Sequence, residues 1–334
     1  MEKKVNKDNM SENIDKYINK IHHLDFLDNS IPDKSINLII ADPPYFGVKG
    51  DFDFIWSSFD DYLKDVEKWA IECKRILADT GTLLWYGHAK NIAYSQIIFD
   101  KHFNLLNSIV WEKTVCRTKR TDFDQSRVFA PVTERVLMYS NEIEMTGFEF
   151  IEKEYIAPRN PFAKELKKAR LKKGVSINAV AEYGKFYGNV NHGGAVTNWE
   201  RGYNIPQKEQ WEILCNNLPI ERQEYEDLRQ EYEELRRPFN NDLKLLDVMR
   251  FDQEANISKK YNHDTIKPEK LTTALINTCS RKGDIVCVPF AGSGTECAMS
   301  AKEGRDFIGF EIDENHVKTS RERVKEFLDQ GVLF

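Results

Sequence analysis

Two kinds of hydrophobic pattern alternate along most of the chain. Short apolar runs bounded by glycine, proline or charged residues predict buried strands at residues 35–41, 81–86, 105–111, 134–139, 285–288 and 307–311. Apolar side chains at helical spacing predict helices at residues 59–77, 91–100, 271–279, 295–302 and 313–328. Strands that alternate with helices form a mostly parallel sheet covered on both faces. The sequence therefore predicts an α/β fold with a doubly wound sheet.

The middle of the chain has a different pattern. Residues 162–237 are helical in spacing, contain no comparable apolar run and end in the charge-dense segment ERQEYEDLRQEYEELRR. This change indicates a mostly helical domain inserted into the α/β fold. We predict an α/β part at residues 1–140, an intervening region at 141–260 with its helical insert at 162–218, and the rest of the α/β domain at 261–334.

Composition narrows the class of protein. The 334 residues are 41% hydrophobic, which is enough for a sizeable core. Lys and Arg number 48 against 54 Asp and Glu, so the net charge of -6 excludes a protein that holds nucleic acid by bulk positive charge. The six cysteines form no C-x-x-C pair, which indicates reduced thiols rather than a zinc or redox motif. A polar N-terminus and the lack of any apolar run near ~18 residues predict a soluble, cytoplasmic protein without a membrane segment.

The most informative segment is Asp42-Pro43-Pro44-Tyr45, which directly follows the apolar run 35–41. An exocyclic amino group of a nucleobase is a poor nucleophile, because its lone pair is delocalised into the ring. Acceptors aimed at its two N–H bonds, here the Asp42 carboxylate and the Pro43 carbonyl, would draw the nitrogen toward tetrahedral geometry, and the prolines would stiffen the loop. Tyr45 offers a flat face to a base flipped out of a duplex. The pattern favours direct methyl transfer from a sulfonium to an amine; the alternative is a proline turn that only ends a strand.

A second loop indicates a nucleoside-binding site. Residues 289–295, with the sequence PFAGSGT, follow the apolar run 285–288 and open a helix. Glycines let a ligand approach backbone N–H groups, and a helix N-terminus is electropositive. Glu311 ends the next strand, where a carboxylate can accept hydrogen bonds from ribose hydroxyls. The alternatives are a dinucleotide site, whose third glycine is replaced by Cys297, and a strand–turn–helix that only packs tightly.

In this order, the two motifs resemble those of the β-class of S-adenosylmethionine-dependent DNA amino-methyltransferases. The resemblance covers most of the chain and includes HDTIKP at residues 263–268, which is similar to the family segment HPTQKP. It implies a Rossmann-like methyltransferase fold with circularly permuted motifs, S-adenosylmethionine as methyl donor, S-adenosylhomocysteine as product, double-stranded DNA as substrate, and no metal. It also implies catalytic roles for Asp42, Pro43, Pro44 and Tyr45, and cofactor-binding roles for Asp25, Lys267, Pro289, Phe290, Gly292, Ser293, Gly294, Thr295 and Glu311.

The chain departs from the family pattern in places. Val288 stands where the family usually has an aspartate, and Leu24 stands where a glycine is usual. In the family, Asp before Pro-Pro-Tyr usually implies the N6 amine of adenine, and Ser implies the N4 amine of cytosine. Both targets are exocyclic amines, so the adenine prediction rests on the resemblance, and N4-cytosine is the alternative. Methylation at cytosine C5 is not predicted, because no cysteine follows a proline.

The helical insert is similar to the helix-turn-helix of phage repressors in the run through Trp199, Pro206 and Trp211. We predict a helix from about residue 162, a second capped by Ser176 and a third at 195–202. The segment between the second and third helices is too long and glycine-rich for a tight turn. A recognition helix here would carry side chains toward base edges, whereas the alternative is a domain that only packs.

Two basic stretches, at residues 117–127 and 164–173, add candidate phosphate contacts. A solvated helix face is the usual alternative for such a run. The acidic segment 221–234 is expected to face away from DNA. The predicted DNA-binding residues are Arg117, Lys119, Arg120, Arg127, Lys167, Lys168, Arg170, Thr197, Asn198 and Arg201.

The sequence thus predicts a site-specific DNA adenine-N6 methyltransferase, encoded by a bacterium or a phage. The alternative from another class is a DNA-binding regulator with an inert methyltransferase fold. A homodimer would suit the class, and a cognate restriction endonuclease would accompany an enzyme of restriction–modification. The sequence leaves both of these partners open.

Overall fold

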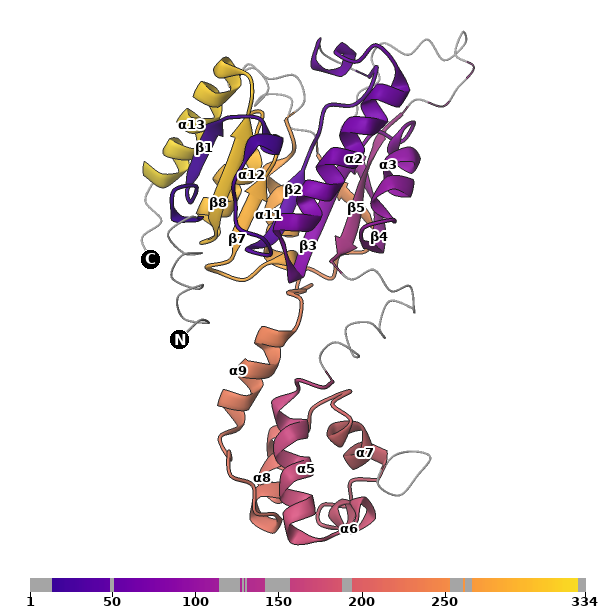
Figure 1. Cartoon of the computed structure of the whole chain (residues 1–334), viewed down its shortest axis with the longest axis vertical. Coiled ribbons are helices and arrows are strands. Elements are labelled where there is room, and N and C mark those ends of the chain that lie inside the picture. The colour runs from indigo at the N-terminus through magenta and orange to yellow at the C-terminus, as the bar shows by residue number, and fades with distance from the viewer. Residues whose placement is uncertain are drawn as a thin grey trace. The chain divides into compact units, whose positions relative to one another are not determined.

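The computed structural model describes residues 14–48, 51–113, 127, 129, 131–141, 157–187, 194–252, 261 and 266–329. The chain forms two compact units (Figure 1). The first, here called the sheet unit, joins Met1–Ile143 with Pro238–Phe334, and the second, the helical unit, is Glu144–Arg237. The chain therefore leaves the sheet unit once and returns to it.

The sheet unit is built on one eight-stranded sheet. In spatial order its strands are β1 (Lys20–His23), β8 (Asp306–Glu311), β7 (Ile285–Val288), β2 (Ile36–Ala41), β3 (Leu77–Gly87), β5 (Thr133–Ser140), β4 (Asn104–Lys113) and β6 (Val248–Phe251). Both antiparallel pairings in it involve β5, so the other strands all point the same way. One edge of the sheet, the carboxyl edge, therefore carries the ends of those strands and the start of β5. The opposite edge is the amino edge.

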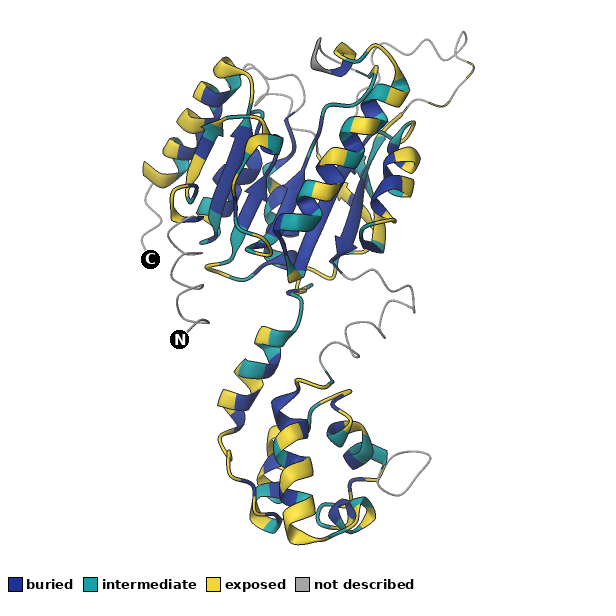
Figure 2. Ribbon diagram, viewed as in Figure 1, coloured by how far each residue is buried: buried dark blue, intermediate teal, exposed yellow. Residues whose placement is uncertain are grey.

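Helices cover both faces of the sheet (Figure 2). Alternate residues of β2 belong to two separate apolar clusters, with Ile39 in one and Leu38 and Ile40 in the other. Because successive strand residues point to opposite faces, this division explains why β2 is apolar throughout. The doubly wound prediction is confirmed. The first cluster includes α2 (Phe59–Ile76) and α3 (Ile92–Phe99), and the second includes α11 (Glu269–Cys279), α12 (Thr295–Lys302) and α13 (Glu314–Asp329).

All predicted strands and helices of the α/β pattern are present, with ends that differ by a few residues. Strands β1 and β6 were not predicted. Each lies at an edge of the sheet and has one buried residue, Ile21 and Met249 respectively, so neither forms an apolar run. The 3-10 helices η1 (Phe26–Asp28) and η2 (Asp51–Phe54) were also not predicted. No helix in the described ranges is long and apolar enough to cross a membrane.

The helical unit has an apolar core of its own, which includes Phe162, Trp199 and Trp211. The Ser176 hydroxyl accepts the Ala179 N–H at 3.2 Å, which confirms the predicted helix cap. The described residues of this unit contain helices and no strand, as the pattern predicted. The helices are α5 (Pro161–Lys173), α6 (Ile177–Glu182), α7 (Gly194–Glu200), α8 (Lys208–Asn217) and α9 (Tyr225–Leu235).

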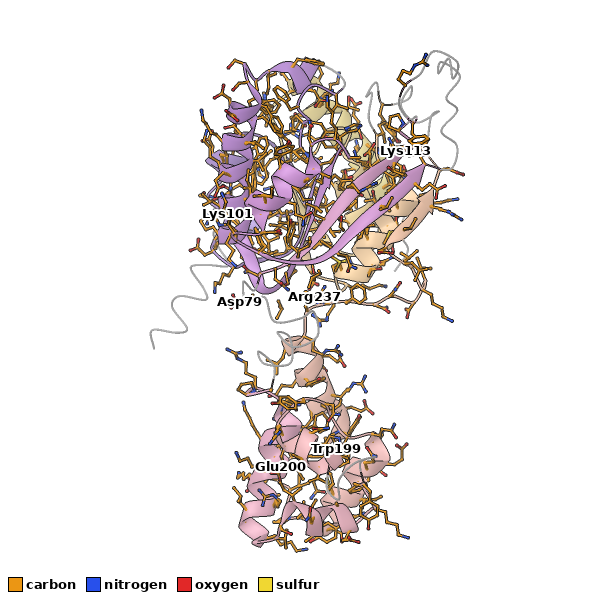
Figure 3. The ribbon with its side chains drawn as sticks, turned by 90° about the vertical axis from the view of Figure 1, so that its right-hand side faces the viewer. Asp79, Lys101, Lys113, Trp199, Glu200 and Arg237 are labelled. Atoms are coloured by element: carbon orange, nitrogen blue, oxygen red, sulfur yellow. The ribbon has the colours of Figure 1, made fainter. Side chains whose placement is uncertain are left out.

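The chain leaves and re-enters the sheet unit at the amino edge. Just after β5, Asn141 Nδ2 donates to the carbonyl of Leu77, the first residue of β3, at 2.8 Å. On the return, the Asn240 N–H donates at 2.8 Å to the carbonyl of Thr278, in the last turn of α11 and shortly before β7. Figure 3 labels Asp79, near the start of β3, and Lys113, at the end of β4, toward opposite ends of this unit. Both connections therefore join the sheet unit at its amino edge.

Candidate active site

Loops from four neighbouring strands meet at the carboxyl edge. Strand β2 leads into Asp42-Pro43-Pro44-Tyr45, and the adjacent β7 leads into residues 289–295. Strand β8 ends at Glu311, and β1 beside it leads to Asp25. From β2 the sheet continues through β3 on one side, and from β7 it continues through β8 on the other. Open α/β sheets bind their ligands at such a reversal of strand order.

Both oxygens of the Asp42 carboxylate have a partner. The Tyr45 hydroxyl donates to Oδ1 at 2.6 Å, and Lys267 Nζ donates to Oδ2 at 2.6 Å. Asp53 holds the loop in place, since its carboxylate accepts the Tyr45 backbone N–H. The resemblance had suggested that Lys267 binds the cofactor, which stays a prediction; the structure places its ammonium group against the catalytic-motif carboxylate.

Lys267 lies in a nearly closed environment of two carboxylates and two aromatic rings. Its side chain is 4% exposed, and Nζ lies 3.3 Å from Glu134 Oε2 in addition to its contact with Asp42. The same nitrogen lies 5.5 Å from the ring centre of Tyr45 and 5.1 Å from that of Tyr86. Glu134 reaches this place because the antiparallel strand β5 starts at the carboxyl edge.

Burial and charge act against each other on the pKa values here. Burial raises the pKa of Asp42 above its ordinary value, and the Lys267 charge opposes that rise. Burial acts to raise the pKa of Glu134 as well, but Lys267 and Lys113 hold it below its usual value. Burial, followed by the nearby Asp42 charge, raises the pKa of Glu296 to about 7. Lys267 thus favours the ionised form of both Asp42 and Glu134.

The loop at 289–295 is joined to the end of β8 by hydrogen bonds. The Gly292 N–H donates to Glu311 Oε2 at 2.8 Å, and the N–H groups of Ile312 and Asp313 each donate to Oε1 at 2.9 Å. A carboxylate has about four acceptor positions, so Oε2 keeps one for a hydroxyl donor such as a ribose. Gly294 has φ 76°, and a Cβ atom there would lie 2.8 Å from Ser320, so only glycine fits.

A buried arginine ties this loop to two helices. Arg323 of α13 is 0% exposed, and its Nη1 donates to the hydroxyls of Ser293 at 3.2 Å and Thr295 at 2.7 Å. Its Nη2 donates to Glu269 of α11 at 2.7 Å. These bonds hold the side chains of Ser293 and Thr295, which follow the two glycines of the loop. Sequence reasoning missed Arg323, because a single arginine in a helix carries no local signal.

Aromatic side chains surround the start of the same loop. Pro289 is buried, and the Phe290 ring lies 4.9 Å from that of Trp69 and 6.4 Å from that of Phe26. Asp25 is exposed at the end of β1, where its side chain caps η1 through the Leu27 N–H. The apolar wall, the electropositive helix start and the free acceptor position on Glu311 suit a nucleoside cofactor such as S-adenosylmethionine.

The predicted DNA-binding residues fall into three groups. Arg117, Lys119 and Arg120 lie outside the described residues, and Arg127 is exposed. In the helical unit, Lys167, Asn198 and Arg201 are exposed and Thr197 is half-buried. Arg170 and Lys168 are engaged elsewhere: the Arg170 guanidinium binds Glu200 and the Val175 carbonyl, and Lys168 Nζ lies 2.6 Å from Glu221.

A hollow between α5 and the end of α7 is bordered by three exposed cations, Lys164, Lys167 and Arg201. It has a volume of about 520 Å³. Trp199 and Glu200, labelled in Figure 3, mark the end of α7, where the buried Trp199 belongs to the core and Glu200 holds Arg170. We call this feature the α5–α7 hollow; its lining residues are Ala157, Pro158, Ala163, Lys164, Lys167, Glu200, Arg201 and Tyr203.

Known proteins resemble the chain in sequence and in fold. A family model described as DNA methylase matches residues 36–322. The chain is 26% identical over 336 residues to the type II methyltransferase M.HinfI of Haemophilus influenzae, covering 95% of this chain and 71% of that protein. It is also 26% identical over 300 residues to the DNA adenine methyltransferase YhdJ of Escherichia coli K12, covering 88% and 78%.

Solved structures give the same fold. The PvuII DNA methyltransferase, described as cytosine-N4-specific, matches with a TM-score of 0.52 at 13% identity, covering 92% of this chain and 89% of that one. A DNA modification methylase of Thermus thermophilus matches with a TM-score of 0.50 at 18% identity, covering 92% and 94%. The family match spans both loops of the carboxyl edge. The chain belongs to the N6/N4 family of S-adenosylmethionine-dependent DNA amino-methyltransferases.

Proposed function

We propose that this protein is a site-specific methyltransferase that moves a methyl group from S-adenosylmethionine to the N6 amine of adenine in double-stranded DNA. The observation that carries the proposal is the position of Asp42. Its carboxylate lies at the carboxyl edge, one strand away from the loop at 289–295. An amine held by Asp42 and a methyl donor held by that loop would therefore approach each other along the edge.

The proposed chemistry assigns distinct tasks to the residues of the site. S-adenosylmethionine, when bound, supplies a methyl group activated by a positively charged sulfur. Asp42 and the Pro43 carbonyl accept hydrogen bonds from the two N–H groups of the target amine. The Tyr45 ring stacks on the flipped base that carries this amine. The nitrogen lone pair forms the new bond to carbon, the carbon–sulfur bond breaks with its electron pair left on sulfur, and the nitrogen then releases a proton. The loop glycines and Glu311 hold the cofactor.

Two arguments support adenine as the target base. The motif begins with an aspartate, which in the family usually accompanies N6-adenine methylation, and the relative YhdJ is named as an adenine methyltransferase. The competing candidate is N4 of cytosine, since the PvuII structure is described as specific for it. Mass spectrometry of nucleosides from treated, unmodified DNA separates the two: N6-methyladenine supports the proposal and N4-methylcytosine overturns it.

We also propose that the helical unit contacts DNA through the α5–α7 hollow and the neighbouring Asn198. Lys164, Lys167 and Arg201 bring three cations to one concave surface, and Tyr203 adds a half-exposed ring. Such a surface suits phosphates, while Asn198 suits a base edge. Arg170 is left out of this proposal, because Glu200 and a backbone carbonyl occupy its guanidinium.

Replacing the catalytic-motif carboxylate tests the proposed chemistry. We expect Asp42→Ala to keep S-adenosylmethionine binding, measured by calorimetry, and to lose at least about a hundredfold in methylation rate, because one acceptor for the target amine is gone. Asp79→Ala, which removes an exposed ion pair near the amino edge, serves as the control. Undiminished turnover by Asp42→Ala would show that the mechanism is wrong. Absence of any cofactor affinity in the wild type would favour the regulator with an inert fold.

A further inference from the structure

The ammonium group of Lys267 is held in place by its buried surroundings. The side chain is 4% exposed, yet Nζ lies 2.6 Å from Asp42 and 3.3 Å from Glu134. The centres of the Tyr45 and Tyr86 rings lie 5.5 Å and 5.1 Å from the same nitrogen. An ammonium group removed from water is retained only where opposite charges and ring faces replace the lost hydration. Here those groups leave Lys267 little freedom to turn away from Asp42.

Glu134 is in turn fixed by its own neighbours. Its Oε1 forms an ion pair with Lys113, while its Oε2 faces Lys267. In the register of β4 and β5, Glu134 pairs with Trp111, two residues before Lys113 at the end of β4. Both side chains of this second ion pair therefore extend from paired strands rather than from loops. Strands hold functional side chains more rigidly than loops do.

We propose that Lys267, held in place by Glu134, is a positioning residue for the methyl-transfer reaction. Lys267 anchors Oδ2 of Asp42, and Oδ1 is the oxygen that accepts an N–H of the target amine. The Tyr45 hydroxyl occupies Oδ1 in this structure and gives way when its ring stacks on the base. This inference rests on the proposed role of Asp42 and assigns separate tasks to its two oxygens.

The charges around Asp42 determine in which direction its pKa moves when a neighbouring charge is removed. Asp42 must be ionised, because a protonated carboxyl would present an O–H donor to the amine. Lys267 favours the ionised form, whereas Glu134 disfavours it. Among the residues that the structure describes, the other titratable groups that face Asp42 are the Tyr45 and Tyr86 hydroxyls and Glu296 of α12. Lys267 and Glu134 thus act together in positioning Asp42, but they shift the pKa of Asp42 in opposite directions.

The experiment measures single-turnover methylation of DNA across pH for Lys267→Met and Glu134→Gln in the full chain. We expect both variants to lower the maximal rate, Lys267→Met by about a hundredfold, while the KM for DNA stays within about twofold of wild type and Glu134→Gln keeps the calorimetric affinity for S-adenosylmethionine. The acid limb of the rate profile moves to higher pH in Lys267→Met and to lower pH in Glu134→Gln. Lys267→Arg, which keeps the charge, recovers part of the rate.

Lys113→Met is the matched control, because Lys113 contacts Glu134 but not Asp42. We expect it to move the acid limb less than Lys267→Met does. A wild-type rate and pH profile in Lys267→Met would overturn the inference, as would acid limbs that shift in the same direction in Lys267→Met and Glu134→Gln. If Lys267→Met does not fold, Lys267→Arg and Glu134→Gln carry the test, and an unshifted profile in both overturns it. Retained turnover in Asp42→Ala, in contrast, would overturn the proposed function itself.

Discussion

Glu296 is a buried carboxyl group of the sheet unit that the proposed chemistry does not use. It follows the loop at 289–295 directly, and its side chain is 5% exposed. Its Oε1 has no hydrogen-bond partner within the described residues. Burial, with the Asp42 charge nearby, raises its pKa from 4.5 to about 7. The folded protein therefore keeps a proton on Glu296 over a pH range in which the unfolded chain has lost it.

The stability of the protein should fall with pH because of this group. Between pH 4.5 and about 7 the folded state binds more protons than the unfolded state, so the contribution of Glu296 is complete below pH 4.5 and is lost as pH rises through about 7. At about 1.4 kcal/mol per pKa unit, the loss in unfolding free energy is about 3 kcal/mol. We expect Glu296→Gln to flatten this slope in urea titrations, and the exposed Glu322→Gln to leave it unchanged. Equal slopes in the wild type and Glu296→Gln would contradict the assignment.

At the scale of residues, the sequence predicts those site residues that lie in contiguous motifs. Asp42 and Tyr45 share one tetrapeptide, and Glu311 ends an apolar run. Glu134 and Arg323 could not be predicted in their roles, because each is a single charged residue whose partners come from distant elements. The contact between Lys267 and Asp42 joins residues 225 positions apart. Only the folded sheet brings such residues together.

The basic residues of helix α5 lie on different sides of the helix and have different neighbours. Lys168 and Lys172 both approach Glu221, at 2.6 Å and 3.7 Å. Lys164 and Lys167 instead line the α5–α7 hollow. The sequence shows six cations between 164 and 173 but cannot tell which of them face partners within the unit. The structure therefore divides one candidate phosphate track into two sets.

The two sets provide a matched test of DNA contact. We expect Lys164→Gln with Lys167→Gln to weaken DNA binding by about tenfold or more and to reduce the slope of log affinity against log salt by about two, because two phosphate contacts are lost. Lys168→Gln with Lys172→Gln makes the same change of charge on the same helix and should leave both quantities near wild type. Fluorescence anisotropy across a salt series measures them. Equal losses in the two double variants would indicate a general charge effect instead of a contact surface.

Elements were predicted wherever burial imposes a pattern. The central strands have apolar residues on both faces, so each appears as an apolar run, whereas the edge strands β1 and β6 bury one residue each. The direction of β5 was not predicted, because its pattern is the same in either direction. That direction matters for the site, since it places Glu134 at the carboxyl edge.

At the scale of the whole molecule, the two units have separate apolar cores. The covering helices and the loops of the carboxyl edge belong entirely to the sheet unit. The net charge of -6 says little about DNA contact, since the α5–α7 hollow alone is lined by three cations, Lys164, Lys167 and Arg201. Cofactor binding and DNA contact should therefore be separable.

Excising the helical unit tests this separation. We expect a chain in which a short Gly/Ser linker replaces residues 144–237 to bind S-adenosylmethionine with an affinity near that of the full chain, because its core and both loops remain. The same chain should lose most of its affinity for DNA. Calorimetry and a gel-shift assay measure the two properties. If the shortened chain lost cofactor binding while circular dichroism showed an intact fold, the two units would not be independent in function.

The position of the two connections has a consequence for how such a protein can diverge. Asn141 and Asn240 lie at the amino edge, and the residues that would perform the chemistry lie at the opposite edge. A lineage can therefore lengthen, replace or recombine the module between these two asparagines without disturbing the geometry around Asp42. Under the DNA contact proposed for the helical unit, the target sequence could then change from one lineage to another while the reaction stays the same. Under the same proposal, a chimera carrying the insert of a relative would methylate the DNA sequence that the relative recognises, while the residues around Asp42 stayed the same.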